Sequence, residues 1–197
     1  RGEHINAKDW NKVITDKDTI VLDVRNQYET EIGSFKDSLI PQMDHFINFP
    51  DFVDSNLDPK ENKKIAMFCT GGIRCEIASS YLMSQGFEDV CQLEGGVLKY
   101  LEKVEEEDQL WEGECFVFDE RVTVNGALEE GNFIQCFGCR RPLEPEETNS
   151  NFYVKGVSCR FCYNESSDLD KERFAQRQKQ IELADQRGHK HMGAESK

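Results

Sequence analysis

One short segment constrains the fold of this chain more than any other. An apolar run at residues 64–68 leads into a six-residue loop, and apolar residues then recur at helical spacing over residues 75–85. The loop consists of Cys69, Thr70, Gly71, Gly72, Ile73 and Arg74. A strand, a tight glycine loop and a helix start bring backbone N–H groups together, which stabilises a thiolate or another anion on Cys69. The segment therefore predicts a nucleophilic cysteine at the end of a buried strand.

Strand-like and helix-like patterns alternate through the first hundred residues. The expected strands cover residues 19–24, 65–68 and 90–93. The expected helices cover residues 6–14, 26–32, 46–57, 75–85 and 97–104, with Pro50 bending or splitting the third. Such alternation indicates βαβ units and an α/β fold with a parallel sheet flanked by helices. Ligands of these folds gather outside the carboxyl ends of the strands, where Cys69 lies.

A charge run at residues 105–108 indicates a domain edge. We expect a catalytic domain over residues 1–108 and a C-terminal module over residues 109–197. The module begins with a hairpin pattern around residues 115–124, continues with a cysteine-rich segment, and ends in a helix over residues 166–187.

Composition limits the partners and the compartment. The net charge is -14, yet the last third of the chain is close to neutral, so a polyanion would meet that third or a local patch. No apolar run approaches the ~20 residues of a membrane span. Two C-x-x-C pairs beside a candidate catalytic cysteine suit a reducing cytosol better than a secreted disulfide framework, so we expect a cytoplasmic protein without membrane contact.

The spacing of Cys69 and Arg74 separates two chemistries. Phosphatases of the C-x5-R type need a seven-residue loop around a phosphate, whereas this loop has six residues. The smaller mouth suits a single sulfur or oxygen atom on Cys69. A buried, inert Cys69 is the alternative. Cys75 either resolves a sulfur adduct on Cys69 or packs in the core.

Three motifs resemble the rhodanese homology domain. They are the loop itself, the segment V-L-D-V-R at residues 21–25 with Glu29, and the segment L-E-G-G at residues 93–96. The resemblance implies that Cys69 is the nucleophile and that Arg74 orients the loop or neutralises charge. Gly71 and Gly72 let the backbone curl with its N–H groups inward. Asp23 and Arg25 either pair and fix the loop or take part directly in catalysis, and we favour pairing.

The cysteine pairs Cys136/Cys139 and Cys159/Cys162 are separated by 19 residues. This C-x2-C-x19-C-x2-C spacing is typical of a structural zinc site with four thiolates. Four free cysteines, or two disulfides, are the alternatives. Arginines and aromatic residues interleave with the pairs and would form either an RNA-binding surface or a small aromatic core.

Nearly the whole chain resembles the tRNA uridine hydroxylases (TrhO family). The most specific segments are C-F-V-F-D-E-R-V-T-V at residues 115–124 and the C-x-x-C module with Gly156 and Val157. The resemblance implies oxygen-dependent hydroxylation of the wobble uridine of tRNA to 5-hydroxyuridine, with Cys69 essential, tRNA as partner and molecular oxygen as co-substrate. Family members usually carry a further N-terminal ferredoxin-like domain, so we expect this chain to be truncated.

Neither a flavin or nicotinamide motif nor a His-rich or carboxylate iron site is visible in the sequence. A peroxy or sulfenate-like adduct on Cys69 is therefore our hypothesis for oxygen delivery. Two other functions remain open. One is a sulfurtransferase that moves persulfide sulfur through Cys69, and the other is a non-catalytic module that binds RNA or protein.

Overall fold

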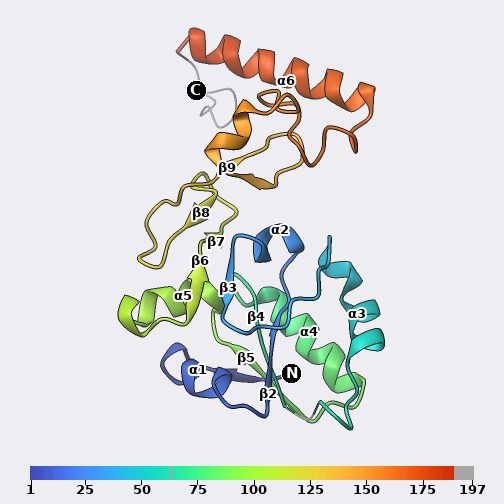
Figure 1. Cartoon of the computed structure of the whole chain (residues 1–197), viewed down its shortest axis with the longest axis vertical. Coiled ribbons are helices and arrows are strands. Elements are labelled where there is room, and N and C mark those ends of the chain that lie inside the picture. Colours follow the sequence, from blue (N-terminus) through green and yellow to red (C-terminus); the bar gives the residue numbers. More distant parts are fainter. Residues whose placement is uncertain (63, 189–197) are drawn as a thin grey trace, which may run out of the picture. The chain divides into compact units, whose positions relative to one another are not determined.

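A computed structural model describes residues 1–62 and 64–188 of the chain (Figure 1). The chain divides into two compact units, Arg1–Gly131 and Asn132–Lys197.

The first unit is built on a parallel four-stranded sheet with strand order β1-β5-β4-β2. The strands are β1 (Glu3–Ile5), β2 (Thr19–Asp23), β4 (Lys64–Phe68) and β5 (Asp89–Leu93). All three pairings are parallel, so the predicted α/β fold is confirmed. The three predicted strands are present. The sheet also has an edge strand, β1, which was not predicted because three residues are too few to show a strand pattern.

Helices cover both faces of this sheet (Figure 1). The helices α1 (Ala7–Ile14) and α5 (Gly96–Lys103) pack on one face, and α3 (Phe49–Asn56) and α4 (Ile73–Ser84) pack on the other. Because side chains alternate along a strand, Val21 enters the first core and Leu22 enters the second. Among the described residues, no helix combines the length and apolar character needed to cross a bilayer.

Local signals explain most helix boundaries. The Asn6 side chain caps α1 by accepting hydrogen bonds from the backbone N–H groups of Lys8 and Asp9. Pro50 lies in the first turn of α3 and splits the predicted helix at residues 46–57 into the 3-10 turn η1 (Phe46–Asn48) and α3. The helix predicted over residues 26–32 is the single turn α2 (Gln27–Thr30).

The first unit extends beyond the predicted boundary at residue 108. A 3-10 turn, η2 (Glu106–Asp108), occupies the charge run, and strand β6 (Trp111–Gly113) then pairs antiparallel with β3 (Gly33–Phe35). Trp111 enters the core and its ring lies 5.2 Å from that of Phe35. The expected hairpin forms from β7 (Cys115–Phe116) and β8 (Thr123–Val124). Burial of aromatic area by Trp111 holds this segment to the first unit.

The second unit has little regular structure besides one long helix. Strands β9 (Ile134–Gln135) and β10 (Pro142–Leu143) form an antiparallel pair, followed by the 3-10 turn η3 (Pro145–Asn149) and helix α6 (Asp168–Gln186). The Ser167 side chain caps α6, and Gly188 follows its end with a φ of +69°. The helix expected over residues 166–187 is thus present with slightly narrower bounds.

Candidate active site and metal centre

Cys69 lies directly after β4, and α4 begins four residues later. Gly72 adopts a φ of +88°, a conformation open to glycine, and this turn aims its N–H group at the Cys69 sulfur at 3.1 Å. Gly71 does not need a positive φ and faces open space. The loop therefore curls around the sulfur as its glycines indicate, with Gly72 as the residue that makes the turn.

The loop lowers the pKa of the Cys69 thiol to about 6. The largest cause is a hydrogen bond from the Cys75 thiol, which lowers this pKa, whereas burial raises it. The charge of Arg74 and the backbone N–H groups of Cys75 and Arg74 lower the pKa further. Burial and this donation raise the pKa of Cys75 well above its usual range. Cys69 is therefore mainly a thiolate at neutral pH, and Cys75 is its proton-bearing neighbour.

Two other cysteines of the first unit behave oppositely. Burial raises the pKa of Cys91 to about 11 and that of Cys115 to about 12. Both lie in the core, as their strand-like surroundings predict. The ionised state of Cys69 is thus a property of its loop, because burial alone has the reverse effect on a thiol.

Arg74 points its guanidinium at a buried carboxylate. Its two terminal nitrogens donate to Glu29 at 2.5 and 2.7 Å, and the Glu29 side chain has no solvent exposure. The Thr70 hydroxyl donates to the same carboxylate at 3.0 Å. Although burial opposes the charge on Arg74, Glu29 raises the pKa of Arg74 above its usual range. Arg74 thus anchors the loop to α2, and most of its charge is already balanced.

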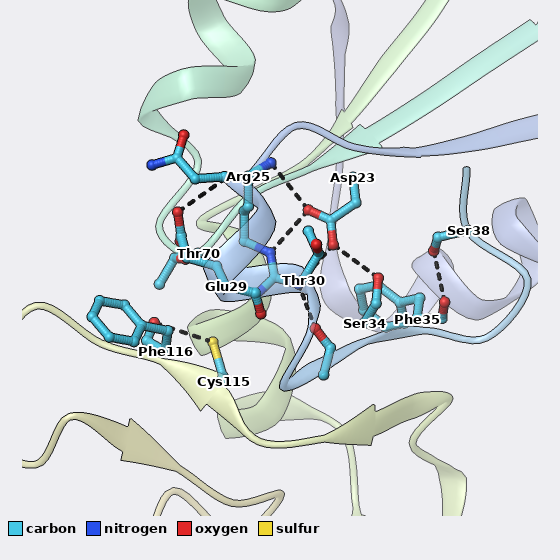
Figure 2. A network of polar contacts seen from close by, with 12 residues as sticks. Asp23, Arg25, Glu29, Thr30, Ser34, Phe35, Ser38, Thr70, Cys115 and Phe116 are labelled. Carbon is cyan, nitrogen blue, oxygen red and sulfur yellow. Dashed lines mark hydrogen bonds and ion pairs between the residues drawn. The ribbon is translucent and has the colours of Figure 1, made fainter. Parts of the chain in front are cut away.

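Asp23 and Arg25 form a second, fully buried ion pair beneath the loop. Arg25 donates to both carboxylate oxygens of Asp23, at 2.9 and 2.6 Å, and to the Gly33 carbonyl. Figure 2 shows Asp23 between Arg25 and Ser34, whose hydroxyl donates to the carboxylate at 2.8 Å. The guanidinium also lies 4.9 Å from the Trp111 ring. Neither group has access to a substrate, so the geometry suits the fixing of the strand end.

The start of α5 holds the loop from another side. The N–H groups of Val97 and Leu98 donate to the carbonyls of Cys69 and Thr70 at 3.0 and 3.2 Å. At Gly96, a β-carbon would lie 2.4 Å from the Cys69 carbonyl oxygen. Sequence reasoning placed Gly96 at a strand end and quoted Glu29 within a motif, yet gave neither a role in holding the loop, because both contacts join distant residues.

A cavity of about 560 Å³ opens beside the loop. The loop contributes Cys69, Ile73 and Arg74 to its wall, and the hairpin contributes Val117, Phe118 and Asp119. Cys69 itself is only 1% exposed and forms part of the wall of this cavity. Sequence reasoning did not assign Phe118, although an aromatic residue within the most specific motif is a signal that could have singled it out.

The four paired cysteines converge as their spacing predicts. The sulfur atoms of Cys136, Cys139, Cys159 and Cys162 lie within 4.8 Å of one another, and all four cysteines are free. Three of the separations are 3.7, 3.8 and 3.9 Å. A tetrahedral ion with metal–sulfur bonds of ~2.3 Å requires an edge of ~3.8 Å. The cluster can therefore hold a metal ion such as zinc, and these separations are too long for disulfides.

The arginines around this cluster lie over its aromatic rings. Arg160 lies 4.1 Å and Arg141 5.6 Å from the Phe161 ring, while Arg140 lies 5.4 Å from the Phe137 ring. Arg160 also pairs with Glu147, and Arg141 pairs with Glu165. These contacts favour the small aromatic core over a basic RNA-binding surface.

A family model and several solved structures match part of the first unit. The model of the family described as rhodanese-like domain matches residues 6–103. A rhodanese-related protein from Thermoplasma volcanium is 29% identical over 51% of this chain and 92% of its own, with a TM-score of 0.42. A rhodanese-like domain from Anabaena is 21% identical over 57% of this chain and 80% of its own, with a TM-score of 0.45.

A NAD-dependent persulfide reductase from A. fulgidus is 29% identical over 50% of this chain but only 16% of its own, with a TM-score of 0.38. The segment matched by the family model, residues 6–103, contains strands β2, β4 and β5 of the parallel sheet, Glu29 and the Cys69 loop. The chain therefore contains a rhodanese-like domain, which carries the Cys69 loop.

Proposed function

We propose that this chain is a tRNA-modifying enzyme that hydroxylates the wobble uridine of tRNA to 5-hydroxyuridine, with Cys69 as its reactive group. The observation that carries the proposal is the cavity shared by Cys69 and the hairpin residues Val117, Phe118 and Asp119. The hairpin holds one of the segments most specific to the hydroxylase resemblance. Because the hairpin and Cys69 line the same cavity, a substrate in this cavity would contact both of them.

The chemistry can be written with a balanced oxidation. The Cys69 thiol, molecular oxygen and two thiol equivalents of a reductant give a Cys69 sulfenic acid, water and a disulfide. The sulfenic oxygen then passes to C5 of uridine, the hydrogen at C5 leaves as a proton, and the Cys69 thiol is restored. A thiol reductant of this kind suits the reducing cytoplasm, where we place the protein.

The surroundings of Cys69 suit this step. A thiol with a pKa of about 6 is ~90% ionised at pH 7, which favours its oxidation to sulfenic acid. The N–H group of Gly72 would stabilise negative charge on the adduct as it does on the thiolate. Arg74, held by Glu29, keeps the loop in place during the cycle.

The test is nucleoside mass spectrometry of tRNA from a host lacking the gene, complemented with wild-type protein or with Cys69→Ser. Wild type should restore 5-hydroxyuridine-derived nucleosides, and Cys69→Ser should not. Cys91→Ser, which changes a buried core cysteine outside the loop, is the matched control and should restore them. Full hydroxylation by Cys69→Ser would refute the proposal.

Sulfur transfer is the second candidate, and the rhodanese-like match over residues 6–103 favours it. The Cys69 thiolate would attack the outer sulfur of thiosulfate, form a persulfide and release sulfite. In the tRNA experiment, this function predicts loss of a thiolated nucleoside in place of 5-hydroxyuridine. Thiocyanate production from thiosulfate and cyanide tests it directly.

A further inference from the structure

Two large hydrophobic side chains in the lining of the Cys69 cavity are exposed, the aliphatic Ile73 at 78% and the aromatic Phe118. Phe118 is 71% exposed and follows β7 at the tip of the hairpin. Together with Ile73 and Leu98, this ring forms an apolar surface around a reactive cysteine, on which a ligand can pack.

The backbone and side chains of the hairpin tip hold Phe118 in place. The Val117 N–H group donates to the Val122 carbonyl at 2.9 Å, and Arg121 grips the Asp119 carboxylate through two nitrogens. Val122 has a φ of +65°, a strained conformation for a β-branched residue. Strain of this kind persists where neighbouring contacts impose it, and it is concentrated at functional sites.

Two further aromatic rings support Phe118 from within the first unit. The Phe118 ring meets Phe116 edge-to-face at 5.2 Å, and Phe116 meets Tyr28 in the same way at 5.2 Å. Phe116 is buried, so the series runs from the core to the exposed ring. Phe118 is therefore a preorganised aromatic surface, which lowers the entropy lost when a ligand stacks on it.

The charge and shape of the cavity define the ligand. Its basic residue, Arg74, already pairs with Glu29, and its acidic residue, Asp119, already pairs with Arg121. Leu98 and Ile73 supply aliphatic wall. A small dianion would meet a thiolate and no unpaired cation on this wall. A neutral, flat heteroaromatic ring would meet apolar surface and a π-face.

We propose that Phe118 is the platform on which the target base stacks, so that a single unpaired nucleotide enters the cavity with its ring over Cys69. The inference deepens the proposed function and rests on it for the identity of the base. Unpaired bases in RNA loops are commonly held by aromatic stacking. Phe118 selects a flat ring and positions it, while Cys69 carries the chemistry.

The test measures binding of the full chain to an anticodon stem-loop RNA by fluorescence anisotropy. One RNA carries uridine at the wobble position, and a matched RNA carries an abasic site there. Wild type should prefer the uridine RNA. Phe118→Ala should weaken its binding by about 5- to 140-fold, the range for loss of one base–aromatic stack, and leave the abasic RNA unaffected.

Three variants make the result specific. Phe118→Trp should restore the preference for uridine, whereas Phe118→Leu, which keeps apolar bulk without a ring, should not. Ile47→Ala removes a side chain that is 83% exposed and outside the cavity lining, and it should match wild type. Alkylation of Cys69 at pH 7 should proceed at the wild-type rate in Phe118→Trp and Phe118→Leu, which shows that the loop is intact.

The outcomes separate this inference from the proposed function. Equal affinity of wild type for the two RNAs, or equal losses on both RNAs in Phe118→Leu, would overturn the stacking role. A stacking preference in a protein that restores no 5-hydroxyuridine in cells would refute hydroxylation and leave the platform in place.

Discussion

Cysteine has opposite roles in the two units of this chain. In the first unit, two buried clusters of largely apolar side chains fill the faces of a sheet, so the packing of this unit does not depend on cysteines. In the second unit, among the described residues, the buried cluster consists of Leu143 and three of the four paired cysteines. The first unit positions Cys69 as a reactive group, whereas the second unit depends on its cysteines for its structure. A domain with so small an apolar core needs a metal ion or a cross-link to be stable.

The largest effect should follow removal of metal from the second unit. A structural zinc site supplies ~10–16 kcal/mol of apparent binding energy, so chelation should unfold residues 132–188 and spare residues 1–131. Hydrogen exchange resolved by peptide would measure this. Cys159→Ala should reproduce the effect, and Cys91→Ala should keep the metal content of wild type. If the metal-free second unit kept its protection from hydrogen exchange, the structural role assigned to its four cysteines would be wrong.

Next in size is the loss of a buried charge partner. Asp23→Ala leaves the Arg25 guanidinium buried without its carboxylate, which should lower the free energy of unfolding by about 3–5 kcal/mol in urea titrations. Asp119→Ala is a matched control, because Asp119 and Arg121 pair with the same sequence spacing at an exposed site. It should leave the urea midpoint unchanged. Equal effects of the two substitutions would contradict the role assigned to burial.

A smaller effect should distinguish two glycines beside the loop. Gly96→Ala combines a φ of +68° with a close approach to the Cys69 and Thr70 carbonyls, and should cost about 1–3 kcal/mol. Gly71→Ala meets open space and should keep the urea midpoint of wild type. A tolerated Gly96→Ala would show that α5 does not fix the loop.

The smallest effect concerns the thiol that donates to Cys69. Cys75→Ala removes this donor, so the midpoint of Cys69 alkylation against pH should rise from about 6 toward the ordinary value of 9. Cys75→Ser keeps a hydroxyl donor and should shift the midpoint less. A midpoint that stays at about 6 in Cys75→Ala would mean that the backbone N–H groups and Arg74 suffice.

Periodicity and spacing predicted what depends on local sequence. Alternation of patterns identified three of the four parallel strands, and the spacing of the C-x-x-C pairs predicted the convergence of four sulfur atoms. Both signals arise because a strand or a metal knuckle is encoded by neighbouring residues.

Contacts between distant residues were beyond such reasoning. Glu29 binds Arg74 from 45 positions away, and β3 pairs with β6 across nearly 80 residues. The first unit runs to Gly131, whereas the sequence pattern predicted a boundary at residue 108. The exposure of Phe118 is likewise a property of the folded hairpin, because residues 115–118 are all apolar and would suit a buried strand equally well.

The most direct test of the account is the pH dependence of Cys69 alkylation by iodoacetamide, followed by peptide mass spectrometry on the native chain. A thiol whose pKa is depressed gains reactivity as pH rises through that pKa, so the rate should rise between pH 5 and 7 with a midpoint near 6. Over the same range, Cys91 should stay unreactive. A Cys69 midpoint near 9, or a Cys69 no more reactive than Cys91, would contradict the thiolate on which the proposed chemistry depends.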